Sequence, residues 1–498
     1  MPPLPVLVFV VGTGSLGAEI AAVRLLAPYF GASTVVWANT IGVVLVALSL
    51  GYWLGGRLAD RHPHLRGLCL LSLVAAGLLA LVPFVSDPLL NLAVGALDEI
   101  SAGAFLGSLL AVLVLVAVPV LLLGAVSPWA IRLALSSLAE AGTVSGRLYA
   151  LSTAGSLVGT LLSALLLIPA LGTRRTFLVF ALAISITAVA GLRPVRRFAL
   201  APAAIAALIA LPVGTLKART DGGRVVHEQE TEYQYARVIE QPGGSRYLEL
   251  NEGLARHSLV RPGTVLTGDY WDGFLVLPFA SRSSAPRRMA ILGNAAGTTA
   301  RAYGRLFPST RVDAVEIDPA LSRIGRRWFD MGGPRLHVYD EDARPFLRRI
   351  RARYDVIAVD SYRQPYIPFY LATREFFELC RERLAAGGVV IVNIGHPEGQ
   401  EKLEQVLTAT AREALPHALR DAVEPTNTLL LASASPLSAD RLRGAVPALP
   451  RQLRATALRA AAALRPPLRG GSVYTDDKAP VEWLVDRSIV DYAAGGGD

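Results

Sequence analysis

The chain has 498 residues, of which 52% are hydrophobic and 18% are charged, whereas an average soluble protein carries about 25% charged residues. This composition excludes a purely soluble protein, and the net charge of +9 is spread over loops without the basic block of a nucleic-acid-binding protein. The only two cysteines, Cys69 and Cys380, exclude a disulfide framework.

The first 216 residues hold the apolar excess, so we expect a multi-span transmembrane domain over 1–216. Arginines gather after the second, fourth and sixth apolar stretches, which places those loops and the N-terminus in the cytoplasm. Six crossings would return the chain to the cytoplasm near residue 195, whereas a seventh crossing would place the rest outside. The seven candidate segments are 4–27, 35–56, 65–85, 103–124, 147–170, 175–192 and 197–214.

Two stretches of this half, "GGRLADR" (55–61) and 146–167, resemble the loop signature and the fifth span of the major facilitator transporters. The resemblance covers about one six-helix half, and without a second half a complete transporter is not expected. Glu19 and Arg24 fall within the first segment, where charges are functional candidates. Arg24, near the helix end, can also extend its charge to the membrane surface.

After residue 216 charged residues become frequent. Runs of alternating apolar and polar residues from about 224 to 260 predict a small antiparallel sheet within a subdomain of 217–283. From 284 to 498, five apolar strands alternate with helices, which predicts a parallel, doubly wound α/β sheet. Ligands bind such sheets beyond the carboxyl ends of the strands. The chemistry is therefore expected at Gly293, Glu316, Asp342 and Asp360, each just past a strand.

These positions predict a nucleoside site. The small residues of "GNAAGT", from Gly293 to Thr298, let the backbone approach a ligand. Glu316, about 20 residues further on, can accept both ribose hydroxyls, and Asp342 can accept the adenine amine. Ala295 takes the middle glycine position of the pyrophosphate fingerprint, which disfavours a dinucleotide and favours an adenosyl sulfonium such as S-adenosylmethionine.

The motifs "ILGNAAGTTARA", "VEIDP", "DEDARPFL", "YDVIAVDSY" and "LATREFFE", in that order over 291–378, resemble the spermidine synthases, which are polyamine aminopropyltransferases. "TEYQYARV", "GDYWDGFLVLP" and "YTDDKAPVEWL" extend the resemblance over 224–484. It implies a methyltransferase-like sheet, a homodimer, no metal, and no permanently bound cofactor, with S-adenosylmethionine or its decarboxylated form as co-substrate. The donor-binding residues that it implies are Gly293, Asn294, Gly297, Glu316, Asp318, Asp342, Ala343 and Gln234. The acceptor-binding residues that it implies are Tyr233, Asp269, Tyr270, Asp272 and Tyr366.

The chain departs from the family where the amine would bind. The acid expected three residues after Asp360 is Arg363, the acid of the glycine turn is Ala296, and Tyr-His-Glu reads Tyr270-Trp271-Asp272. A guanidinium cannot act as a base at neutral pH, but it holds a carboxylate bidentately.

We therefore expect an anion on the donor or the acceptor, recognised by Arg363 beside Asp360. The proline-containing loop after Asp360 is then a lid whose Tyr362, Tyr366 or Tyr370 faces the sulfonium. The alternative is a surface loop in which Arg363 pairs with Glu375.

Three functions follow from these residues. The first is a membrane-anchored transferase or lyase that cleaves a sulfonium C–S bond and leaves methylthioadenosine, and the second is a polyamine aminopropyltransferase that uses Asp360, Asp269, Asp272 or Glu232 as its acid. The third is a nucleoside-binding regulator of the membrane domain, and methyl transfer is a weaker fourth. The expected partners are a nucleoside sulfonium, a polyamine or anionic acceptor and the lipid bilayer. Since adenosyl sulfoniums are cytoplasmic, the soluble domain is expected on the inner side of the cell membrane.

Overall fold

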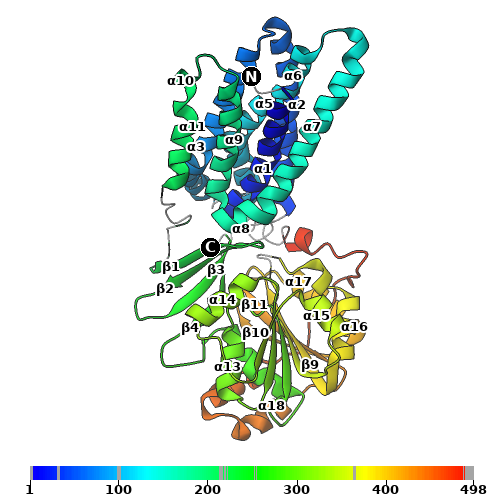
Figure 1. Ribbon diagram of the computed structural model, residues 1–498. Helices are drawn as coiled ribbons and strands as arrows, with labels where there is room; N and C mark the ends of the chain where they lie inside the picture. Colours follow the sequence, from blue (N-terminus) through cyan, green and yellow to red (C-terminus); the bar gives the residue numbers. More distant parts are fainter. Residues whose placement is uncertain are drawn as a thin grey trace. The chain divides into compact units, whose positions relative to one another are not determined.

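The computed structural model describes residues 4–30, 34–97, 103–211, 217, 220, 222–251, 253, 255–362, 366–485 and 487. The chain forms two compact units (Figure 1). The first comprises Met1–Arg219 and Gln229–Tyr235, and the second comprises Thr220–Glu228 and Ala236–Asp498. The three-part division at 216 and 283 stays a prediction.

The first unit is helical. Its α-helices are α1 (Leu4–Phe30), α2 (Thr34–Arg61), α3 (Leu65–Leu97), α4 (Gly103–Val112), α5 (Val118–Gly124), α6 (Val126–Ala134), α7 (Ala141–Leu162), α8 (Ile168–Leu171), α9 (Thr173–Ala190), α10 (Val195–Phe198) and α11 (Leu200–Ala210). Short π-helical turns join α4 to α5 and α7 to α8, so each of these pairs continues as one long rod.

Six helical rods among the described residues are long and apolar enough to cross a membrane, and they coincide with the first six predicted segments. The seventh segment, 197–214, is not among them. Its main helix, α11, has 11 residues, or about 16 Å at 1.5 Å per residue, which is roughly half the hydrocarbon thickness of a bilayer. Residues 212–214 of this segment lie outside the described residues.

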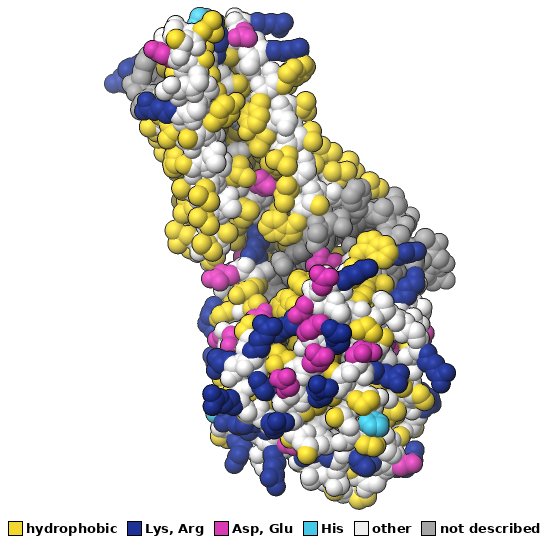
Figure 2. Space-filling view, turned by 90° about the vertical axis from the view of Figure 1, so that its right-hand side faces the viewer, with side chains coloured by type: hydrophobic (Ala, Val, Ile, Leu, Met, Phe, Trp, Pro, Cys, Tyr) yellow, Lys and Arg dark blue, Asp and Glu magenta, His cyan; other side chains and the backbone are white. Residues whose placement is uncertain are grey.

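The outer surface of the helical unit is apolar. Figure 2 shows one face of it covered largely by hydrophobic side chains, with arginines gathered at one end. Exposed side chains include Leu45, Val46, Leu92 and Leu165, which are 57%, 60%, 69% and 71% accessible. Water would disfavour so large an apolar surface, whereas lipid would cover it.

Small residues hold α1 against α7. A Cβ at Gly155 or Gly159 of α7 would overlap the carbonyl oxygens of Phe9 and Thr13 of α1. Ser163 Oγ, just past α7, donates a hydrogen bond to the carbonyl oxygen of Gly17 (3.0 Å). Backbones that approach this closely are typical of helix pairs inside membranes.

The small antiparallel sheet predicted near 224–260 is present. Its strands, in spatial order, are β1 (Arg224–Glu230), β2 (Tyr235–Glu240), β3 (Arg246–Leu250) and β4 (Arg256–Val260). Arg237 of β2 faces Glu249 of β3 across the sheet, with 2.8 Å between Nε and Oε2. The pair is buried, so each charge there needs the other.

The second unit is built on a seven-stranded sheet of spatial order β10-β11-β9-β8-β5-β6-β7. Neighbouring strands from β9 to β7 run parallel, whereas β11 is antiparallel to both β9 and β10. The sheet is therefore mixed, with an antiparallel edge that the predicted parallel sheet lacked. The strands are β5 (Arg288–Leu292), β6 (Arg311–Glu316), β7 (Leu336–Asp340), β8 (Tyr354–Val359), β9 (Leu384–Gly395), β10 (His417–Glu424) and β11 (Asn427–Ser433).

Helices cover both faces of this sheet. In Figure 1, α15 and α16 lie on one side of it and α13 on the other. Along β5, Met289 and Ile291 pack into the cluster that contains residues of α13, while Ala290 and Leu292 pack into the cluster that contains residues of α15 and α16. Burial on both faces explains why the strands are continuous apolar runs. The helices are α12 (Gly273–Val276), α13 (Thr298–Leu306), α14 (Pro319–Trp328), α15 (Ala343–Arg349), α16 (Arg374–Arg383), α17 (Lys402–Ala414), α18 (Ala439–Ala445) and α19 (Arg454–Ala463).

Candidate active site

The strand order reverses between β5 and β8, because the chain continues from β5 to β6 and β7 on one side and then to β8 and β9 on the other. Gly293 follows β5 and Asp360 follows β8. Gly293 has φ +85°, and a Cβ there would overlap the carbonyl of Asp360. Glycine is therefore required where the two strand ends meet, at the edge where doubly wound sheets bind ligands.

The turn after β5 is held by backbone contacts. The N–H groups of Gly293 and Asn294 both donate to the carbonyl oxygen of Val315 (3.0 and 3.1 Å). Gly297, at φ +88°, precedes α13 and packs against Met331. Asn294 is buried, and its Oδ1 has no hydrogen-bond partner among the residues that the structure describes. This oxygen is a candidate acceptor for a ligand group.

Glu316 connects the end of β6 to this turn. Its Oε2 accepts from Ala295 N–H (2.7 Å), and its Oε1 accepts from Asp318 N–H (3.1 Å). Burial raises the pKa of Glu316 to about 7, against the lowering effect of the backbone N–H donors. The carboxyl thus sits at the predicted nucleoside edge and changes charge near neutral pH.

Two of the predicted donor-binding acids cap helices. Asp318 Oδ1 accepts from Ala320 N–H (3.0 Å) at the start of α14, and Asp342 Oδ1 accepts from Arg344 N–H (2.9 Å) at the start of α15. The second oxygen of Asp342 accepts from Tyr370 Oη–H (2.5 Å), so the loop after β8 reaches over this acid. Because both acids already cap helices, their roles in binding a ligand stay predictions. The same holds for Ala343, which follows Asp342 and is buried.

Asp360 accepts hydrogen bonds from the side chains of Asn393, Tyr270 and Trp271. Asn393 Nδ2 of β9 donates to its Oδ1 (2.8 Å), and Tyr270 Oη donates to its Oδ2 (3.1 Å). Burial raises the pKa of Asp360 to about 6, although all three donors lower it. Asn393 is fixed in turn, since its Oδ1 accepts from Asn427 Nδ2 of β11 (2.9 Å). A relay of side chains from β11 through β9 therefore orients the acid.

Tyr270 also lies beside a second carboxylate. Its N–H donates to Glu424 Oε1 (2.7 Å), at the end of β10. Burial raises the pKa of Asp269, while Arg261 and Arg256 lower it. Burial likewise raises the pKa of Glu424, with Asp269 adding a smaller repulsive contribution. Asp360, Asp269 and Glu424 thus surround Tyr270.

The remaining predicted residues are placed differently. Tyr362 Oη donates to the carbonyl oxygen of Asn393 (2.9 Å) and accepts from Gly395 N–H, so its hydroxyl is bound to β9. Tyr366 is 6% exposed and packs in the core cluster beneath the loop. Asp272 accepts from Thr267 N–H, Thr267 Oγ1 and Gly268 N–H (2.9, 3.0 and 2.9 Å) and so fixes its own loop.

Arg363 lies outside the described residues. Tyr233 and Gln234 form a turn in which both N–H groups donate to Thr231 Oγ1 (3.1 and 3.0 Å), within the segment Gln229–Tyr235 of the first unit. Their roles stay predictions.

Sequence reasoning missed Asn393, Asn427 and Glu424. One signal was present, because Asn393 interrupts the apolar strand "VVIVNIG" at its carboxyl end. The pairing of β11 with β9, which brings Asn427 beside Asn393, is a matter of sheet register and has no local signal.

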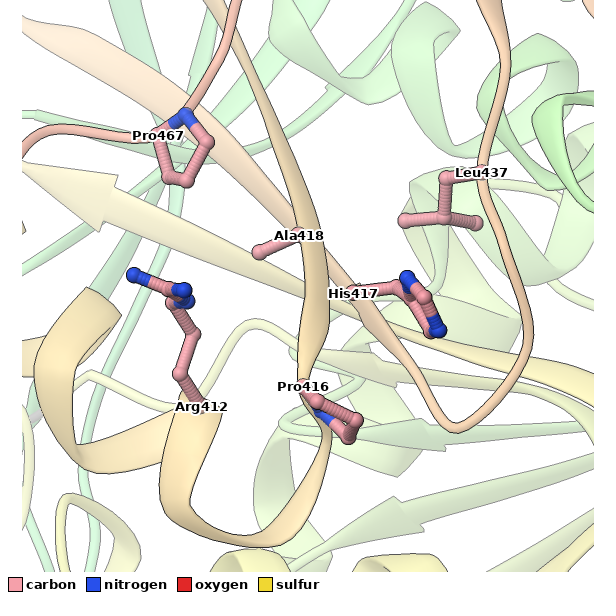
Figure 3. A pocket seen from close by; sticks show the side chains of 6 residues that line it. All are labelled: Arg412, Pro416, His417, Ala418, Leu437 and Pro467. Carbon is pink, nitrogen blue, oxygen red and sulfur yellow. The ribbon is translucent and has the colours of Figure 1, made fainter.

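A surface pocket of about 190 Å³ lies away from this edge (Figure 3). It is lined by Arg412, Pro416, His417, Ala418, Leu437 and Pro467. His417 begins β10, which runs in the same direction as β9, so the pocket lies at the amino ends of the parallel strands. None of the predicted site residues lines it.

Comparison with known proteins agrees with the motifs. Residues 277–434 match the spermine/spermidine synthase domain. A probable polyamine aminopropyl transferase of Bifidobacterium longum is 28% identical over 295 residues, covering 54% of this chain and 65% of the relative. A polyamine aminopropyltransferase of Vibrio vulnificus is 30% identical over 180 residues, covering 34% and 58%. In both cases the match spans less than two thirds of the relative.

A solved structure is also similar. The crystal structure of a probable spermidine synthase from Corynebacterium glutamicum superposes with a TM-score of 0.39 and 23% identity, covering 50% of this chain and 97% of that chain. The matching residues 277–434 contain β5 to β11, and with them Gly293, Glu316 and Asp360. The C-terminal half of the chain therefore carries a spermine/spermidine synthase domain.

Proposed function

We propose that the chain is a membrane-anchored, spermidine-synthase-like transferase that binds an adenosyl sulfonium and transfers or eliminates its propyl-type chain, leaving methylthioadenosine. One observation carries the proposal: the turn after β5 and Asp360 touch at Gly293, where a Cβ would not fit. A nucleoside held by Glu316 and this turn would present its sulfonium beside Asp360. Both carboxyls have a pKa near neutrality because they are buried.

The roles of the site residues follow from this arrangement. Glu316 accepts the ribose hydroxyls, and Asp342 accepts the adenine amine. Asp360, oriented by Asn393 and Tyr270, accepts a proton from the attacking amine and attracts its positive charge. The loop after β8, whose Tyr370 hydroxyl donates a hydrogen bond to Asp342, covers the nucleoside and excludes water.

A second candidate is a polyamine aminopropyltransferase that makes spermidine from putrescine. The carboxylates of Asp269 and Glu424 beside Tyr270 favour it, because a diammonium acceptor needs several negative charges. Arg363 favours an anion instead, and the carboxylate of S-adenosylmethionine would supply one. The two candidates therefore differ in the donor that the site prefers.

Mass spectrometry of products tests both candidates. The purified protein is incubated with S-adenosylmethionine, and separately with decarboxylated S-adenosylmethionine and putrescine. Methylthioadenosine from the first mixture supports the primary proposal, whereas spermidine with methylthioadenosine from the second supports the aminopropyltransferase. S-adenosylhomocysteine would identify a methyltransferase, and bound nucleoside without any product would identify a regulator.

The donor preference can be reversed at one residue. We expect Arg363→Asp to lower affinity for S-adenosylmethionine by about 1–3 kcal/mol and to spare or raise affinity for its decarboxylated form and for putrescine. Arg363→Lys keeps the charge without the bidentate geometry and should fall between the two. Calorimetry with both sulfoniums measures the change. Equal affinities of the wild type and Arg363→Asp would place the aminopropyltransferase ahead.

A further inference from the structure

Helix α1 carries an acid in the middle of the helical unit. Glu19 is the sixteenth of its 27 residues, so it lies about 22 Å from one end of the helix and about 16 Å from the other. Glu19 is 8% exposed, and it forms no hydrogen bond or ion pair with any residue that the structure describes. An acid at this depth needs a neutralising partner.

A second polar group shares this face of α1. Ser15 precedes Glu19 by four residues, which places the two side chains one above the other along the helix. Ser15 is 4% exposed, and its Oγ has no hydrogen-bond partner within the described ranges. Two buried oxygen-bearing side chains on adjacent turns thus have no hydrogen-bond donor among the described residues.

Other charges of the described helices do not neutralise Glu19. Arg24, further along α1, donates to the backbone carbonyl of Glu232. Asp87, inside α3, is paired with Arg174 and accepts from Tyr29 Oη (2.9 Å). The remaining charged residues of helices in this unit lie at or near helix ends: Arg57, Asp60, Arg61, Arg66, Arg132, Glu140, Arg147, Arg175, Arg196 and Arg197.

An ionised carboxylate in an apolar interior is costly unless a cation accompanies it. We propose that Glu19 and Ser15 form an exchangeable site for a monovalent cation, which a proton occupies when no other cation is bound. The carboxylate supplies the charge, and the serine hydroxyl supplies a further oxygen ligand. Binding of another cation releases the proton. The helical unit then has a binding function of its own, beyond anchoring the second unit.

Dicyclohexylcarbodiimide tests the site, because it adds to protonated carboxyls in apolar surroundings. With the full chain in detergent, peptide mass spectrometry should find the adduct on Glu19, with a yield that falls as pH rises. Sodium and potassium are added in separate arms. Protection by one of them identifies the cation, whereas dependence on pH alone identifies a site for the proton. Glu19→Gln should lose the adduct.

Asp87→Asn is the matched control and should leave the Glu19 adduct unchanged, because Asp87 is already paired. Ser15→Ala should keep the adduct but raise the cation concentration needed for half-maximal protection about tenfold. If the proton is the occupant, Ser15→Ala should instead shift the pH of half-maximal labelling. Absence of the adduct from wild-type Glu19 at every pH, or a yield independent of both pH and cations, would overturn the proposal. Affinity for methylthioadenosine, measured on the same samples, reports separately on the second unit.

Discussion

At the scale of single residues, two buried carboxyls, Glu316 and Asp360, carry the proposed chemistry. Burial raises the pKa of the first to about 7 and of the second to about 6. Each therefore exists in two charge states near neutral pH, and ligand binding selects one of them. The ionised form of Glu316 suits two hydroxyl donors, and the ionised form of Asp360 suits an ammonium.

Glu316 should control nucleoside affinity and its pH dependence. Replacing it by alanine removes the proposed acceptor of the ribose hydroxyls, so Glu316→Ala should weaken methylthioadenosine binding by roughly 2–4 kcal/mol. Because only the ionised carboxyl accepts both hydroxyls, the wild-type affinity should fall about tenfold per pH unit below pH 6 and level off above pH 8. Calorimetry between pH 5 and pH 8.5 measures both effects.

The control is Glu316→Gln, which keeps an acceptor oxygen for one backbone N–H but does not titrate. Its affinity should be reduced and independent of pH. A wild-type affinity that is flat across this range, or an unchanged affinity in Glu316→Ala, would remove the nucleoside from this position.

Asn393 should act as a positioning residue for Asp360. Asn393→Leu removes the 2.8 Å hydrogen bond to the carboxylate, so kcat should fall about 10- to 100-fold, as expected for one hydrogen bond to a charged group. KM for the sulfonium should stay unchanged. Because this hydrogen bond lowers the pKa of Asp360, its loss should move the acid limb of the rate profile above pH 6.

Asn427→Leu is the graded control, since it removes only the outer link to Asn393. A smaller loss of kcat and a smaller shift of the acid limb are expected. If Asn393→Leu lowered activity without moving the acid limb, its role would be packing rather than orientation of the acid.

At the scale of elements, Arg344 of α15 ties the loop after β8 to the C-terminal stretch. Its guanidinium makes two hydrogen bonds to the Asp476 carboxylate (2.8 and 2.6 Å) and one to the carbonyl oxygen of Tyr370 (3.1 Å). Thr373 Oγ1 donates to the same carboxylate (2.7 Å). The "YTDDKAP" stretch thus acts as a clamp on the loop.

Removing this clamp should loosen the loop. Arg344→Ala should raise hydrogen–deuterium exchange over 366–373 by about 10- to 100-fold, since it removes a bidentate pair of about 1–3 kcal/mol. KM for the sulfonium should rise with it. Arg349→Ala on the same helix is the control, because Arg349 is largely exposed and pairs with Glu341. Equal exchange in both variants would show that the clamp does not hold the loop.

The strands and the residues that follow them could be predicted from the sequence because burial on both faces leaves uninterrupted apolar runs. The relay through Asn393 and Asn427 could not, because it depends on how β9 and β11 pair. The helix-capping roles of Asp318 and Asp342 were hidden for another reason. An acid between a strand and a helix can bind a ligand or cap the helix, and the local sequence pattern is the same in both cases.

At the scale of the whole molecule, the side of the membrane that the second unit faces is decided by α10 and α11. If the six apolar helices cross a membrane, the arginine-rich loops favour the cytoplasm for the end of the helical unit that holds Leu138. Lys217 Nζ, just after α11, donates to the carbonyl oxygen of Pro28 (3.0 Å) at the opposite end of α1, whereas adenosyl sulfoniums occur in the cytoplasm. We expect Arg224→Cys, at an exposed position of β1, to be protected from a membrane-impermeant thiol reagent in intact cells.

Native cysteines should not interfere, because Cys69 and Cys380 are both buried. Leu171→Cys should share the protection of Arg224→Cys, because Glu230 at the end of β1 accepts a hydrogen bond from Thr173 N–H. Leu138→Cys, at the opposite end of α7 and α8, should react. Labelling of Arg224→Cys from outside would contradict both the cytoplasmic location and the sulfonium enzyme.

The contact at Gly293 limits how the site can be altered. The turn after β5, on the proposed donor side, and the end of β8, on the proposed acceptor side, touch through backbone atoms. Because this backbone is close-packed, neither segment can move without displacing the other. A substitution that reshapes one side must therefore displace the other. In the proposed enzyme, donor preference and acceptor preference would therefore be mechanically coupled, and an engineered change of donor should be sought together with compensating changes around Asp360.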